Sequence, residues 1–154
     1  MIVVLEADSV RFSESKLSDS VFACIYLKYD VDKYFPECGW DDFAEIILEW
    51  WVDGAVSLLK NGGSSVFRFM DGDFAFEIKM EENRKFLIEL REKSKILAPK
   101  DFDFIKFCQS LAAACNLLLR RVQEISKNRE VLSSLNARLN ILRNILRNPN
   151  FSFE

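Results

Sequence analysis

Acidic side chains gather on one side of a predicted helix that spans residues 40–60. At about 100° per residue, a helical projection places five carboxylates within about a third of the circumference; they belong to Asp41, Asp42, Glu45, Glu49 and Asp53. Large apolar residues fill the opposite side, namely Trp40, Phe43, Ile47, Trp50, Trp51 and Leu58. Carboxylates concentrated in this way could bind a basic molecule.

The spacing of these carboxylates has a cost for the helix. Asp41, Glu45, Glu49 and Asp53 repeat every four residues, and like charges at this spacing destabilise a helix by about 0.2–0.5 kcal/mol per pair. The helix dipole compensates acidic residues only in the first turn. No basic residue follows until Lys60, so the strip has no counter-ion on its own helix.

Two aliphatic residues, Val52 and Val56, project into the same sector. A strip that combines carboxylates with exposed aliphatic groups is typical of a protein interface. The predicted partner-binding residues are therefore Asp41, Asp42, Glu45, Glu49, Val52, Asp53 and Val56. A solvated acidic face is an equal alternative.

The chain has no histidine, which excludes Ser-His-Asp and Cys-His triads and histidine-ligated zinc. Its four cysteines form no Cys-x-x-Cys pair, so we expect reduced thiols. Gly62-Gly63 precedes a predicted strand, whereas a phosphate-binding loop leads into a helix. The sequence therefore predicts no catalytic residue, no metal and no cofactor, although an enzyme that acts through carboxylates is a further alternative.

Composition indicates one folded domain over residues 1–154. Hydrophobic residues make up 49% and charged residues 29% of the chain, which excludes disorder. No apolar run approaches the roughly 20 residues that span a bilayer. The opening MIVVLEAD lacks the basic region of a signal peptide, so we expect a cytoplasmic protein without membrane contact.

Alternating apolar residues predict the strands. Residues 2–7 form an opening strand, and residues 21–29 are apolar on both sides, as in a central strand. Two alternating runs flank Asp71-Gly72, which predicts a hairpin with a two-residue type I′ turn. In that register one face carries Phe67, Phe69, Phe74 and Phe76, and a third strand extends it with Phe86, Ile88 and Leu90. Residues 93–100 are expected to be a connection.

Two helices are expected after residue 101. The first carries an apolar stripe from Phe104 to Ile125, with Asp101 or Asp103 as its N-cap. The second, residues 130–147, has leucines at spacings of three and four, which predict a seam against another helix: Leu132, Leu135, Leu139, Leu142 and Leu146. A break at Asn128 would let the two helices form a hairpin, whereas one continuous helix would require a dimer.

The element order is thus β-β-α-β-β-β-α-α, which predicts an α+β fold. We expect an antiparallel sheet of about five strands, one central acidic helix and two C-terminal helices. Residues 1–100 hold the sheet and the acidic helix, and residues 101–148 form the helical section.

Basic residues of the helical section could line a nucleic-acid surface. Residues 101–154 carry 8 basic and 5 acidic side chains, a smaller excess than that of a typical nucleic-acid-binding domain. The arginines, including Arg120, Arg138 and Arg143, are better interpreted as solvated helix faces, so no nucleic-acid partner is expected.

The stretch YFPECGWDDFAEIILEWW, followed by VFRFMDGDFAFEI, resembles a pattern in small bacterial immunity proteins encoded beside polymorphic or contact-dependent toxins. The resemblance covers about residues 25–80 and lies in Phe35, Pro36, Gly39, Trp40, Asp42, Phe43, Trp50, Trp51, Phe69, Met70, Asp71 and Gly72. It implies an α+β protein that neutralises a toxin by covering its basic active site.

We therefore expect a non-enzymatic protein-binding module, immunity-like, whose acidic helix face engages a basic protein. The alternative is a self-assembling structural or adaptor protein that dimerises through its C-terminal leucines. A monomer is favoured slightly over a homodimer.

Overall fold

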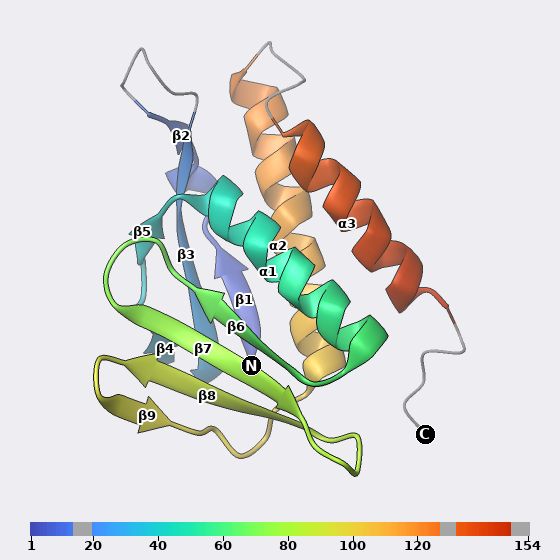
Figure 1. Ribbon diagram of the computed structural model, residues 1–154. Helices are drawn as coiled ribbons and strands as arrows, with labels where there is room; N and C mark the ends of the chain where they lie inside the picture. Colours follow the sequence, from blue (N-terminus) through green and yellow to red (C-terminus); the bar gives the residue numbers. More distant parts are fainter. Residues whose placement is uncertain (14–19, 127–131, 149–154) are drawn as a thin grey trace.

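The chain builds two antiparallel sheets and three helices, so the predicted α+β class is confirmed (Figure 1). The computed structural model describes residues 1–13, 20–126 and 132–148. Its strands form one sheet of five and one of four, where the sequence had predicted one sheet of about five. The prediction missed four short strands, because a run of two or three residues is too short to show a period.

The five-stranded sheet is organised around β3 (Val21–Asp30), the predicted central strand. β1 (Ile2–Leu5), β2 (Arg11–Phe12), β4 (Lys33–Phe35) and β5 (Asp41–Asp42) all pair with it in antiparallel fashion. A 3-10 turn, η1 (Ala7–Ser9), joins β1 to β2. Alternate residues of β3 enter the core, where Ala23, Ile25 and Leu27 have no exposed surface.

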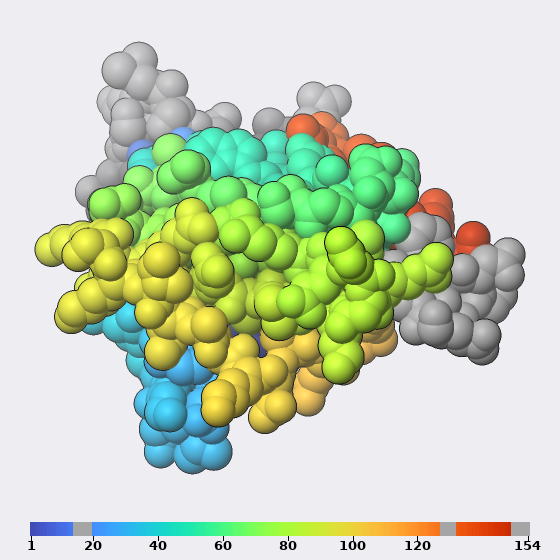
Figure 2. Space-filling model, turned by 60° about the horizontal axis from the view of Figure 1, so that its bottom comes forward, coloured from blue at the N-terminus to red at the C-terminus, as the bar shows by residue number. Residues whose placement is uncertain are grey.

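The four-stranded sheet is a meander of β6 (Ser64–Arg68), β7 (Phe74–Met80), β8 (Phe86–Glu92) and β9 (Lys95–Leu97). Figure 2 shows its yellow-green atoms across the middle of one molecular face. On the outward side of this sheet Glu77 pairs with Arg91 and Lys79. β9 lies in the segment expected to be a connection.

The register of the β6–β7 hairpin is as predicted, with Phe67 opposite Phe76. The rings of Phe67 and Phe76 stack, Phe69 contacts Trp51, and the half-buried Phe74 contacts Trp40. The four predicted phenylalanines therefore share one core face.

The predicted type I′ turn is wrong. The hydrogen bond nearest the turn runs from Phe69 N–H to Phe74 O, at 3.1 Å. Residues 70–73 therefore form a four-residue loop in place of the predicted two-residue turn. A type I′ turn needs positive φ at both central residues, whereas of Asp71 and Gly72 only Gly72 has one. The loop N–H groups of Met70 and Asp71 point instead to the carboxylate of Asp42.

Three helices complete the core: α1 (Ala44–Asn61), α2 (Phe104–Ile125) and α3 (Ser133–Leu146). α1 contacts both β3 and β6 and so joins the two sheets. α2 packs on β1, and the side chain of Asp103 caps it by accepting from Lys106 N–H at 2.9 Å, as predicted.

The leucine seam is buried within the chain. α3 packs against α1 and α2, and Leu135, Leu139 and Leu142 have no exposed surface. α2 and α3 are separate antiparallel helices that lie side by side (Figure 1). The predicted break at Asn128 falls outside the described residues, but the hairpin arrangement that it implied is the one observed.

Candidate functional site

The helix of the candidate site begins later than the sequence suggested. Asp41 and Asp42 lie in β5, where they pair with Cys24 and Ala23 of β3. The helix starts at Ala44, and Phe43 precedes it without a side-chain cap. The two aspartates are therefore not first-turn residues, because the backbone of this segment bonds to β3.

Asp42 was predicted to bind a partner, and this is wrong because its side chain is buried. The residue is 1% exposed. Its carboxylate accepts the N–H of Phe43 at 2.7 Å, the indole N–H of Trp40 at 3.2 Å, and the backbone N–H of Met70 at 3.0 Å and of Asp71 at 3.2 Å. Asp42 thus connects the segment that precedes α1 to the β6–β7 loop by hydrogen bonds.

Val52 is also misassigned. It has no exposed surface, and Val56 is only partly exposed and packs against the core. The helical projection placed both valines beside the carboxylates because it could not include α3, which lies against α1. The two valines that were predicted to form the apolar part of the interface therefore pack in the core or against it.

The four remaining carboxylates form what we call the acidic rim: Asp41, Glu45, Glu49 and Asp53. The rim runs from β5 along α1. The side chain of Asp53 is 57% exposed, that of Asp41 43%, and that of Glu49 21%. Glu45 is partly buried.

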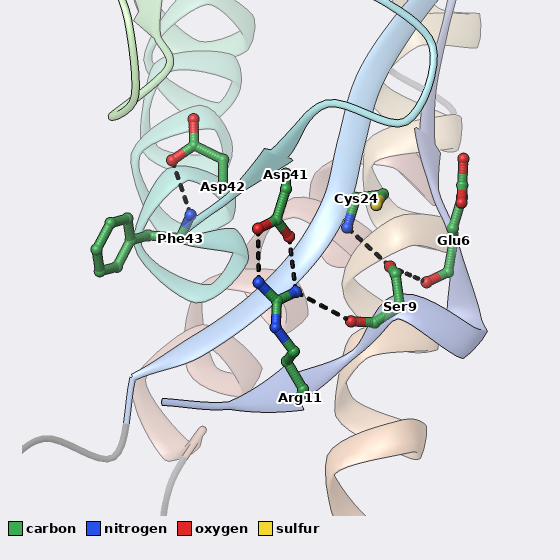
Figure 3. A network of polar contacts seen from close by, with 7 residues as sticks. All are labelled: Glu6, Ser9, Arg11, Cys24, Asp41, Asp42 and Phe43. Carbon is green, nitrogen blue, oxygen red and sulfur yellow. Dashed lines mark hydrogen bonds and ion pairs between the residues drawn. The ribbon is translucent and has the colours of Figure 1, made fainter. Parts of the chain in front are cut away.

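Arg11 binds the first carboxylate of the rim (Figure 3). Its guanidinium donates two hydrogen bonds to Asp41, at 2.7 and 2.6 Å, and lies 5.3 Å from the centre of the Phe22 ring. Ser9 supports this end of the rim, because its hydroxyl donates to Glu6 O and accepts from Cys24 N–H. The bidentate geometry is the one that arginine and a carboxylate prefer.

Arg138 of α3 binds the other end of the rim. Its Nε lies 3.0 Å from Asp53 Oδ2, and its Nη1 lies 3.7 Å from Glu49 Oε2. The hydrogen bond to Asp53 raises the pKa of Arg138 above its usual value. Sequence reasoning missed this counter-ion because 85 residues separate Arg138 from Asp53.

The rim therefore combines four carboxylates with two arginines in the part of the chain that the structure describes. Arg138 relieves the repulsion between Glu49 and Asp53 that the helical spacing implied. Such a surface can hold guanidinium groups.

Two of the four cysteines are buried in α2. All four are free thiols, and burial raises the pKa of Cys108 and of Cys115 to about 12. A thiol with such a pKa is a poor nucleophile near neutral pH. Among the described residues, no group of three or more cysteine, aspartate or glutamate side chains could hold a metal ion.

Other arginines of the helical section bind within the protein. Arg121 donates to Ala7 O and pairs with Glu124, and Arg143 bonds to Asn116. Within residues 1–13, 20–126 and 132–148, no helix has the length and apolar character needed to cross a bilayer.

No protein-family model, curated protein or solved structure matches this chain. The resemblance to immunity proteins thus depends on the sequence pattern alone. Four residues of that pattern, Trp40, Asp42, Met70 and Asp71, belong to the same hydrogen-bonded cluster. Folding requirements explain this part of the pattern without any partner.

Proposed function

We propose that this chain is a non-enzymatic protein-binding module that engages a basic protein with its acidic rim. The observation that carries the proposal is the position of Arg138 between Glu49 and Asp53. It demonstrates that these carboxylates accommodate a guanidinium, and Asp53 still exposes more than half of its side chain. Arginines of a partner can use the same chemistry at the outer side of the rim.

The partner class that we propose is a bacterial toxin with a basic active site. Support comes from the sequence pattern around Trp40 and Gly72 and from the α+β build. The free thiols, which include the exposed Cys38, suit the reducing cytoplasm in which such a protein would act.

The competing function, dimerisation through the C-terminal leucines, has less support. Those side chains contact α1 and α2 of the same chain, so an assembly through them would require the helices to separate. The cost of exposing Leu135, Leu139 and Leu142 to water would oppose this opening.

Affinity capture from the native host tests the proposal. The wild-type chain is compared with a rim variant that carries Glu45→Gln, Glu49→Gln and Asp53→Asn, and with a control that removes the same charge at exposed sites: Asp73→Asn, Glu81→Gln and Glu82→Gln. A basic protein should co-purify with the wild type and the control, and be lost from the rim variant. Equal capture by the rim variant would contradict the assignment of the rim.

A growth assay then tests the partner class. The captured protein is expressed in a test bacterium with the wild type or the rim variant. We expect growth arrest that the wild type relieves and the rim variant does not. A captured protein that leaves growth unchanged would contradict the toxin partner while leaving the binding function intact.

A further inference from the structure

A groove of about 700 Å³ lies between the C-terminal half of α2 and the facing side of α3, from Leu132 to Arg143. This size is in the range of small-molecule sites. The groove is separate from the acidic rim, which lies on β5 and α1.

Polar donors line the groove from both helices. α2 contributes Asn116, Arg120 and Gln123, which share one helix face because they are spaced by four and three residues. α3 contributes Ser133, Asn136 and Arg143.

The apolar part of the lining consists of Leu119, Val122 and Leu132. Val122 and Leu132 are buried, at 3% and 4% exposure, and form a hydrophobic base below the polar side chains. No carboxylate occurs among the described residues that line the groove.

The two arginines are held differently. Arg143 is fixed across the groove by its hydrogen bond to Asn116 and by a longer one, at 3.4 Å, to Asn140. Asn116 lies one turn before Arg120 on α2, so the guanidinium of Arg143 is held one helical turn from Arg120. Arg120 is exposed.

The N-terminal end of α3 adds positive potential at the opposite end of the groove from Arg143, which lies about 15 Å further along the helix axis. Leu132, in the N-cap position, forms no side-chain cap, and the first turn of α3 has no acidic residue. The first N–H groups of a helix carry about half a positive charge, and here they meet the groove at Ser133.

We propose that this groove binds a small phosphorylated molecule, with Arg120 and Arg143 on the phosphate oxygens. Two guanidinium groups and the side-chain amide N–H donors of the groove offer more donors than the two oxygens of a carboxylate can accept. The partly exposed Leu119 would contact an apolar part of the same ligand. The proposal is independent of the protein partner proposed for the acidic rim.

Titration calorimetry with inorganic pyrophosphate at about 150 mM salt tests the proposal. The wild type is compared with Arg120→Gln, which replaces an exposed residue and should fold normally, and with the control Arg68→Gln, an exposed arginine of β6. We expect a dissociation constant below about 1 mM, weakened by about tenfold or more in Arg120→Gln and by less than about twofold in Arg68→Gln.

Absence of measurable binding, or equal weakening in both variants, would overturn the proposal. Two further titrations, with a single-stranded oligonucleotide and with vesicles of phosphatidic acid, separate the possible sources of phosphate. Binding of either one without binding of pyrophosphate would also overturn it, because the groove would then serve a macromolecular or membrane surface.

Discussion

The carboxylate of Asp42 accepts the backbone N–H of Met70 at 3.0 Å across 28 residues of sequence. This contact connects β5, which pairs with the first sheet, to the loop of the second sheet. It explains why the β6–β7 loop is longer than an Asp-Gly turn, because the N–H groups of residues 70 and 71 are directed toward Asp42.

We expect Asp42→Asn to lower the free energy of unfolding by about 2–4 kcal/mol, since an amide has one acceptor oxygen and would turn its own N–H groups toward buried donors. Urea unfolding monitored by tryptophan fluorescence measures the change. Asp73→Asn, at an exposed site of the same loop, should change stability by less than about 0.5 kcal/mol. Equal effects of the two substitutions would show that the Asp42 cluster contributes no stability.

Phe69→Ala should cost about 3–5 kcal/mol, as for other buried aromatic residues. Phe69 is 4% exposed and contacts the rings of Phe35, Trp40 and Trp51. Its exposed neighbour Met70, at 41% exposure, provides the control substitution Met70→Ala. A loss below about 1 kcal/mol for Phe69→Ala in the same urea experiment would contradict the shared core face.

The buried seam predicts a monomer. Light scattering over a wide dilution series should give the mass of one chain throughout, because α1 and α2 already cover Leu135, Leu139 and Leu142. A dimer mass that persists on dilution would support the self-assembly alternative.

Thiol labelling at about pH 8 should separate the cysteines by burial. The exposed Cys38 should react with iodoacetamide in the folded protein, whereas Cys108 and Cys115, with a pKa raised to about 12, should react only after unfolding. Mass spectrometry of the labelled peptides identifies each site. Rapid labelling of Cys108 in the native state would contradict the packing of α2.

The same raised pKa has a consequence for stability at alkaline pH. In the unfolded chain these thiols ionise near pH 9, while in the folded chain they stay protonated to about pH 12. Their contribution to stability is therefore complete below about pH 9 and should decrease as pH rises from 9 toward 12.

The parts of the fold that sequence could predict are those set by local pattern. Alternating phenylalanines predicted the β6–β7 register, and of the two N-cap candidates, Asp101 and Asp103, the structure has Asp103 at the start of α2. The two-residue strands β2 and β5 were missed because they exist only through pairing with β3.

The candidate site was predicted less well because long-range packing determines it. A helical projection treats residues 40–60 as one isolated helix, so it could not show that β3 pairs with Asp41 and Asp42 or that Val52 is buried in the folded chain. The ion pair of Arg138 with Asp53 has no signal in local spacing. Of the seven predicted residues, Asp42 and Val52 are buried and stabilise the fold. The four carboxylates of the acidic rim are the ones for which we propose partner binding.

The rate of association with the captured basic partner tests the central claim most directly. Measured by stopped flow at about 50 and 500 mM salt, the wild-type rate constant should fall steeply with salt, as expected for electrostatic steering. The variant with Glu45→Gln, Glu49→Gln and Asp53→Asn should associate about tenfold more slowly at low salt, approach the wild-type rate at high salt, and retain wild-type stability within about 1 kcal/mol. An unchanged rate and affinity in this variant would contradict the claim, because the rim carboxylates would then serve only their arginines and the solvent.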